Sequence, residues 1–115
     1  MKKIMIVDDS PVDTKHLNRI LQDAGYAVVI AISGADALEK AVTDKPDMIM
    51  MDINMPGLDG FATTRKLGQN PDTKAIPVIF VTSKDQKVDR AFAQMVGAKG
   101  YVTKPYLPEQ ILAQL

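Results

Sequence analysis

Apolar residues gather in four short runs along the chain, and a fifth, weaker run follows near the C-terminus. Each run is continuous and does not alternate with polar residues, which predicts strands buried on both faces, as in a parallel sheet covered by helices on both sides. The predicted strands are residues 4–7, 28–32, 48–51, 78–81 and 101–102.

Helical patterns occupy the segments between these strands. The first two helices are predicted to begin at Ser10 and Ser33, each a serine N-cap followed three residues later by an aspartate that would close a capping box. The first has apolar residues at helical spacing and then Gly25, which favours a left-handed stop, whereas the second ends before Pro46. The apolar positions of the first helix are Leu17, Ile20, Leu21 and Ala24.

The three later helices differ in how clearly the sequence marks them. A third is predicted over residues 59–67, with a poor apolar pattern. The fourth is predicted to begin with a capping box from Ser83 to Gln86 and to stop at Gly97. The last begins near Pro108 and is short. The apolar stripe of the fourth helix is Val88, Ala91, Phe92 and Met95.

Strands that alternate with helices predict right-handed βαβ crossovers and a doubly wound α/β sandwich. The length of 115 residues suits one compact domain over residues 1–115. The hydrophobic share of 46% and the charged share of 24% are typical of a globular protein.

Charge and cysteine content narrow the function classes. The 14 basic and 14 acidic residues cancel, which argues against nucleic-acid binding. The sequence has no cysteine, which excludes disulfides and thiolate metal sites and fits a reducing cytoplasm. The apolar run before Asp8 is too short for a signal peptide or a membrane span. We therefore expect a cytoplasmic protein that binds neither nucleic acid nor membrane.

Polar residues that carry chemistry follow the predicted strands. In a parallel α/β sheet, ligands bind beyond the carboxyl ends of the strands, so these residues are expected to share one edge. They are Asp8 and Asp9 after the first strand, Asp52 after the third, Thr82 and Ser83 after the fourth, and Thr103, Lys104 and Pro105 after the fifth.

Crowded carboxylates repel one another unless a cation compensates them, and oxygen ligands without imidazole or thiolate favour Mg²⁺. Asp9, Asp52 and a backbone carbonyl are the predicted ligands. Asp52 is the natural nucleophile for an aspartyl phosphate, and Thr82 and Lys104 are placed to contact phosphoryl oxygens. The residues thus predict Mg²⁺-assisted phosphoryl transfer to a carboxylate.

With these residues in place, the sequence resembles the receiver (CheY-like) domains of two-component response regulators over essentially its whole length. Two stretches, 56–60 and 83–86, are also similar to stand-alone receivers of twitching-motility and chemotaxis-like systems. The landmarks that carry the family resemblance are Val7-Asp8-Asp9-Ser10, residues 51–60, Val81-Thr82-Ser83, Tyr101 and Thr103-Lys104-Pro105.

The resemblance implies a flavodoxin-like sheet of strand order 2-1-3-4-5 and a signalling switch that is not a conventional enzyme. Its partners would be a sensor histidine kinase or phosphotransfer protein, and a target bound by helix 4, strand 5 and helix 5. Self-phosphorylation and self-dephosphorylation with Mg²⁺ are also implied.

The resemblance also implies a role for each matching residue. These roles are phospho-acceptor for Asp52; Mg²⁺ ligands for Asp8, Asp9, Asp52 and the backbone carbonyl of Asn54; phosphoryl binding for Thr82 and Lys104; switch aromatic for Tyr101; and a cis peptide before Pro105.

Other functions remain open at this point. A haloacid-dehalogenase-type phosphatase also uses an aspartyl nucleophile, but its second carboxylate is replaced here by Asn54, and the chain leaves no room for a cap domain. A nucleotide- or flavin-binding module would need a glycine-rich loop after the first strand, where Asp8-Asp9-Ser10-Pro11 stands instead. A pseudo-receiver that acts only as a scaffold is a further alternative, against which the complete set of acidic, threonine and lysine residues argues.

Overall fold

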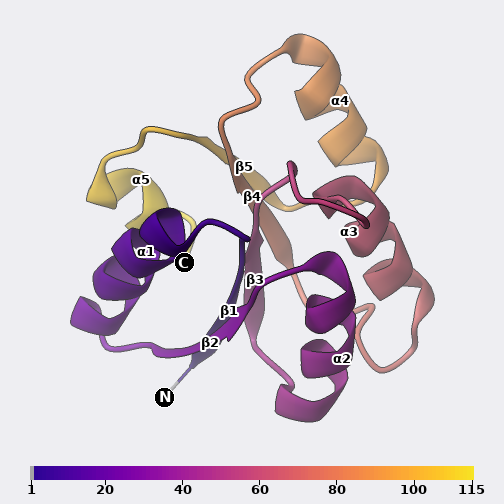
Figure 1. The fold of residues 1–115 in the computed structure, drawn as a ribbon, viewed down its shortest axis with the longest axis horizontal. Helices are drawn as coiled ribbons and strands as arrows, with labels where there is room; N and C mark the ends of the chain where they lie inside the picture. The colour runs from indigo at the N-terminus through magenta and orange to yellow at the C-terminus, as the bar shows by residue number, and fades with distance from the viewer. Residues whose placement is uncertain (1) are drawn as a thin grey trace.

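Figure 1 shows the fold of the chain in a computed structural model that describes residues 2–115; Met1, the first residue of the predicted domain, lies outside the described residues. Five parallel strands form one sheet in the order β2-β1-β3-β4-β5, as the resemblance implied. The strands are β1 (Lys3–Val7), β2 (Ala27–Ala31), β3 (Met48–Met51), β4 (Val78–Thr82) and β5 (Gly100–Thr103).

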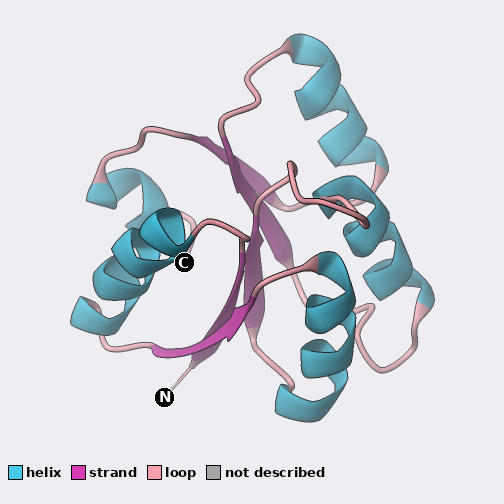
Figure 2. Cartoon of the chain, viewed as in Figure 1, coloured by secondary structure: helices cyan, strands magenta, loops and turns pink. Residues whose placement is uncertain are grey.

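Helices cover both faces of this sheet (Figure 2), which confirms the doubly wound α/β architecture. On one face lie α1 (Pro11–Asp23) and the short α5 (Pro108–Leu112). On the other lie α2 (Gly34–Asp44), α3 (Gly60–Gln69) and α4 (Lys87–Met95). None of the helices in residues 2–115 combines the length and apolar character needed to cross a membrane.

The core consists of two layers, one on each side of the sheet, because successive strand residues point to opposite faces. Met5, Val7 and Phe80 pack with residues of α2, α3 and α4. Ile4 and Ile6 pack with residues of α1 and α5. The inner strands β1, β3 and β4 are therefore buried on both faces, as their continuous apolar runs predicted.

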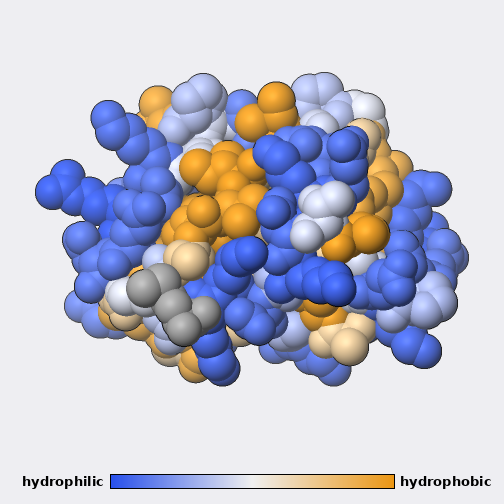
Figure 3. All heavy atoms as spheres, turned by 90° about the horizontal axis from the view of Figure 1, so that it is seen from below, coloured by the Kyte–Doolittle hydropathy of each residue, from blue (hydrophilic) through white to orange (hydrophobic). Residues whose placement is uncertain are grey.

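Strand β2 departs from this prediction because it is an edge strand. It pairs with β1 alone, and four of its five residues are only half-buried. Viewed from below, apolar side chains gather near this edge between hydrophilic surfaces (Figure 3). The strand also ends at Ala31, so the predicted final residue, Ile32, lies outside it and is 67% exposed. An apolar run alone does not distinguish an edge strand from a central one.

Helix ends agree with the sequence in several places. Ser10 and Ser33 cap α1 and α2 with their side chains. Gly25 and Gly97 have positive φ angles of 94° and 89° after α1 and α4, which is the left-handed conformation that glycine adopts without a Cβ clash. Asp59 caps α3 through a hydrogen bond from the Ala62 amide.

Helix α4 corrects two predictions. It begins at Lys87, with Gln86 as N-cap, and the Gln86 amide donates to the Asp89 carboxylate. Residues 83–86 therefore form a loop and not the predicted capping box. The predicted apolar stripe does not face the core: Val88 is 63% exposed and Met95 is 81% exposed, whereas Ala93 is buried. The helix packs on the core through Ala93 and through Phe92, whose ring centroid lies 4.8 Å from that of Phe61, and it leaves Val88 and Met95 in solvent.

Candidate functional site

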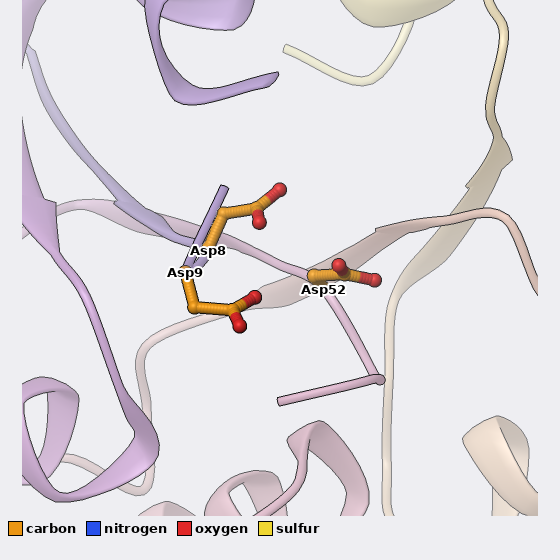
Figure 4. A group of neighbouring side chains, drawn as sticks. All are labelled: Asp8, Asp9 and Asp52. Carbon is orange, nitrogen blue, oxygen red and sulfur yellow. The ribbon is translucent and has the colours of Figure 1, made fainter. Parts of the chain in front are cut away.

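The three predicted acidic residues meet at the carboxyl edge of the sheet (Figure 4). Asp8 and Asp9 follow β1, and Asp52 follows β3. The two strands pair in parallel, with Val7 opposite Met51, so the residues after them are neighbours. One carboxylate oxygen from each aspartate lies within 4.8 Å of the other two. Strand register thus produces the cluster that the sequence predicted.

Backbone amides fix two of these carboxylates. The Ser10 amide donates to Oδ1 of Asp8 at 2.9 Å, and the Ile53 amide donates to Oδ1 of Asp52 at 2.7 Å. Both side chains are largely buried, whereas Asp9 is exposed. Each buried carboxylate therefore has one oxygen held by the backbone and one oxygen, Oδ2, directed toward other groups.

The Oδ2 atoms of Asp8 and Asp52 both face the ammonium group of Lys104, which follows β5. Its Nζ lies 2.8 Å from Oδ2 of Asp8 and 3.4 Å from Oδ2 of Asp52. A third carboxylate, Oδ2 of Asp13, lies 2.9 Å from the same nitrogen. One ammonium group is therefore shared by three carboxylates in this structure.

Burial and charge act in opposite directions on these groups. Burial raises the pKa of Asp8, although hydrogen bonds from Lys104 and from the Ser10 amide oppose that effect. Burial disfavours the charged form of Lys104, but its hydrogen bonds to Asp8 and Asp13 and the charge of Asp52 outweigh burial and raise the pKa of Lys104 above its usual value. The ammonium therefore stays protonated at neutral pH.

Asp13 is a site residue that sequence reasoning missed. We predicted it to close a capping box with Ser10, and its amide does donate to Ser10 Oγ at 3.3 Å. Its carboxylate, however, binds Lys104, and the Ser10 amide binds Asp8 instead. The available signal was position, because the first turn of a helix whose N-cap, Ser10, directly follows Asp9 lies at the same edge of the sheet.

Thr82 and Tyr101 are joined through one backbone segment. Thr82 ends β4 and is fully buried, and its Oγ1 accepts a hydrogen bond from the Lys84 amide at 3.3 Å. The Tyr101 hydroxyl donates to the Lys84 carbonyl at 2.7 Å. The Tyr101 ring meets Phe80 edge-on at 6.3 Å. The loop after β4 therefore contacts both the predicted phosphoryl-binding hydroxyl and the predicted switch aromatic.

Arg90 of α4 adds a second set of contacts around this loop. Its guanidinium lies over the Tyr101 ring at 4.5 Å and donates to Asp85 at 3.1 Å and to Thr103 at 2.9 Å. The loop after β4, the helix α4 and the strand β5 are thereby linked by one side chain.

The mouth of the site is a pocket of about 410 Å³ beside Asp52 and Lys104. One wall contains His16, which is exposed and stacks on Tyr106 with ring centroids 5.4 Å apart. The peptide before Pro105 is cis. Asn54 is exposed in the loop after β3, between the buried residues Ile53 and Met55.

Gly60 holds the start of α3 against the acidic cluster. A Cβ atom on this residue would lie 2.3 Å from the backbone oxygen of Asp52. The Gly60 amide donates to the Ile53 carbonyl at 2.9 Å. The close approach of α3 to Asp52 therefore requires glycine at this position.

The acidic cluster suits Mg²⁺ chemically, because it offers hard carboxylate oxygens. Two carboxylates are pre-oriented by backbone amides, and exposed Asp9 leaves the cluster open toward solvent. A doubly wound sheet with such a cluster, a lysine and a buried threonine at one edge has the arrangement of a phospho-acceptor domain.

Comparison with known proteins identifies the family. The family model described as the response regulator receiver domain matches residues 4–115. Protein PilH of Pseudomonas aeruginosa is 46% identical over 112 residues, which are 97% of this chain and 93% of PilH. The chain belongs to the response regulator receiver domain family, the phospho-acceptor switches of two-component signal transduction.

Solved structures agree with this assignment. The chemotaxis protein CheY4 of Vibrio cholerae superposes with a TM-score of 0.92 at 34% identity, covering 98% of this chain and 94% of CheY4. The receiver domain of the sensor histidine kinase PA1611 from Pseudomonas aeruginosa, solved with a magnesium ion in its active site cleft, gives a TM-score of 0.89 at 28% identity, covering 97% of this chain and 92% of that domain.

Proposed function

We propose that Asp52 is the phospho-acceptor of this receiver domain and that its donor is a phosphohistidine of a sensor kinase or phosphotransfer protein. The observation that carries the proposal is the orientation of the Asp52 carboxylate. The Ile53 amide holds Oδ1, while Oδ2 faces Lys104 beside the pocket mouth. Oδ2 forms a bond to phosphorus as the bond from phosphorus to the histidine nitrogen breaks, and the nitrogen keeps the electron pair.

Asp8, Asp9 and Asp52 would hold Mg²⁺, together with the backbone carbonyl of Asn54. The clustered carboxylate oxygens support this proposal, as does the magnesium ion in the cleft of the PA1611 receiver domain. Bound Mg²⁺ would neutralise negative charge on the phosphoryl group during transfer.

Lys104 and Thr82 would bind the phosphoryl oxygens. Lys104 already lies 3.4 Å from Oδ2 of Asp52, the oxygen that would carry the phosphorus. Thr82 ends β4, the strand next to β3, and Asp52 directly follows β3. The two residues therefore belong to the same edge of the sheet. The pocket mouth leaves a route for water and for small phosphodonors. Attack by water would return the switch to its resting state by self-dephosphorylation.

The output surface would be formed by α4, β5 and α5 and would bind a target protein. Val88, Phe92 and Met95 leave apolar surface on α4, and such patches are common at protein interfaces. Thr82 and Tyr101 both contact Lys84 in the loop before α4. Movement of Thr82 toward a phosphoryl group would therefore alter Tyr101 and α4 together. We place this exchange in the cytoplasm, where phosphoryl donors derived from ATP are available.

Intact-mass measurement after incubation with acetyl phosphate and Mg²⁺ tests the acceptor. Wild-type protein is expected to gain one phosphoryl group, and Asp52→Asn to gain none, because an amide lacks the nucleophilic carboxylate. Asp23→Asn, at the far end of α1, makes the same change in charge and should be labelled like wild type. Labelling of Asp52→Asn at the wild-type level would reject this acceptor.

A further inference from the structure

The ammonium group of Lys104 is fully occupied in this structure. An ammonium offers three N–H donors, and Nζ of Lys104 contacts three carboxylates, those of Asp8, Asp13 and Asp52, at 2.8, 2.9 and 3.4 Å. A phosphoryl oxygen that binds Lys104 must therefore displace a carboxylate or share its donor.

The three carboxylates differ in how easily they can be released. The side chains of Asp8 and Asp52 are 7% and 11% exposed, whereas that of Asp13 is 44% exposed. A buried carboxylate that loses its partner keeps an uncompensated charge, but an exposed one is solvated by water. Asp52 is in addition the group that would carry the phosphoryl group. Asp13 is therefore the partner that costs least to release.

We propose that Asp13 is a positioning residue that competes with the phosphoryl group for Lys104. The proposal rests on the phosphorylation of Asp52 proposed above. In the resting state Asp13 holds the ammonium toward the first turn of α1, and the phosphoryl group takes that place after transfer. The energy needed to break the Asp13–Lys104 pair is subtracted from the gain of the phosphoryl–Lys104 contact, so Asp13 lowers the stability of the phosphorylated state.

The competition has a structural consequence at α1. Asp13 is the third residue of this helix, and its amide binds the Ser10 side chain. Release of its carboxylate removes the link between the first turn of α1 and Lys104 after β5. Phosphorylation at Asp52 would thus be sensed on the α1 side of the sheet as well as at α4.

The test uses beryllofluoride with Mg²⁺, a non-covalent phosphoryl mimic whose binding is an equilibrium measurement. We expect Asp13→Asn to bind it about fivefold more tightly than wild type, which is the change given by a partly exposed ion pair of about 1 kcal/mol. Asp23→Asn removes the same charge from the other end of α1 and should bind as wild type does. Unchanged or weaker binding by Asp13→Asn would overturn the proposal.

A second readout detects the release itself in the wild-type protein. The side-chain carboxyl ¹³C NMR signal of Asp13 should move toward that of a solvated aspartate when beryllofluoride binds, while the signal of Asp23 stays in place. If Asp13 acted only by general repulsion of the anion, loss of its charge in Asp13→Asn would also tighten binding, but the wild-type signal of Asp13 would not move. A stationary Asp13 signal with ligand bound therefore overturns competition, even if the affinity changes and even if the variant is poorly folded.

The two proposals fail separately. If acetyl phosphate labels wild type but not Asp52→Asn, the acceptor assignment stands whatever Asp13 does. If the acceptor assignment fails, competition for Lys104 at Asp52 fails with it. Labelling that depends on Asp52, combined with equal beryllofluoride affinity in Asp13→Asn and wild type, rejects only the role of Asp13.

Discussion

Helices α1 and α4 flank the site on opposite faces of the sheet, and both have apolar residues at helical spacing. In α1, Leu17 and Leu21 are 4% and 0% exposed. In α4, Val88 and Met95 are 63% and 81% exposed. Periodicity therefore shows that a helix has an apolar side, but not whether the core or solvent lies against it. The α1 stripe stabilises the fold, whereas Val88 and Met95 of the α4 stripe remain exposed to solvent.

Truncating one residue of each stripe gives the largest effect and tests this comparison directly. Leu21→Ala should lower the free energy of unfolding by about 3–5 kcal/mol, because it leaves a cavity in a fully buried position. Met95→Ala should change the free energy by less than about 0.5 kcal/mol. Urea denaturation at fixed pH measures both. Similar losses in the two variants would show that α4 packs on the core through its stripe.

The sequence predicts features that depend on the order of the strands better than features that depend on tertiary contacts of single side chains. We could predict that the acidic cluster, Thr82 and Lys104 share one edge, because strand order and register bring the strand ends together. This holds for any conformation of the side chains. The partner of Asp13 could not be predicted, because a capping box and an ion pair begin from the same local pattern. The start of α4 was also missed, since the loop before it is held by tertiary contacts from Tyr101.

Removing the ammonium group of Lys104 should give the next largest loss in the free energy of unfolding. This group links β5 to the first turn of α1 through Asp13. Lys104→Met leaves Asp8, Asp13 and Asp52 uncompensated, so without Mg²⁺ we expect a loss of about 2–3 kcal/mol, somewhat below that of a fully buried pair because Asp13 is exposed. Millimolar Mg²⁺ should recover part of the loss.

Thermal melts with and without Mg²⁺ measure this change. Lys66→Met, on the exposed surface of α3, is the control and should melt as wild type does. If Lys104→Met matched this control in the absence of metal, repulsion among the carboxylates would not limit stability.

A smaller, pH-dependent contribution to the free energy of unfolding is expected from Tyr106, which stacks on His16 of α1. Burial raises the pKa of Tyr106 to about 12. A tyrosine whose pKa is higher in the folded than in the unfolded state contributes stability that is complete below about pH 10 and is lost as pH rises toward 12. Because the ring is only half-buried, we expect the contribution to be about 1 kcal/mol.

Denaturant titrations between pH 9 and pH 12 measure the Tyr106 effect. Tyr106→Phe should lose less stability over this window than wild type, because phenylalanine has no proton to release. Burial also raises the pKa of Tyr101, so Tyr101→Phe serves as a comparison on the α4 side. Parallel stability curves for wild type and Tyr106→Phe would contradict the prediction.

The smallest expected effect concerns the coupling between the phosphoryl site and α4. Thr82 accepts a hydrogen bond from the Lys84 amide, and Tyr101 donates to the Lys84 carbonyl. Thr82→Ala should still accept a phosphoryl group, since Asp52 and the metal ligands are intact. Its phosphorylation-dependent NMR shifts along residues 91–96 and around Tyr101 should nevertheless be smaller than in wild type.

Arg90→Gln is the matched variant for this last experiment, because it removes the guanidinium over Tyr101 and leaves Thr82 in place. If the signal passes through Thr82 and the Lys84 backbone, Arg90→Gln should keep the shifts around Tyr101 that Thr82→Ala loses. If Thr82→Ala shows wild-type shifts and Arg90→Gln does not, coupling runs instead through the contacts that Arg90 makes with Asp85 and Thr103. Either result would locate the contacts that couple the state of Asp52 to α4.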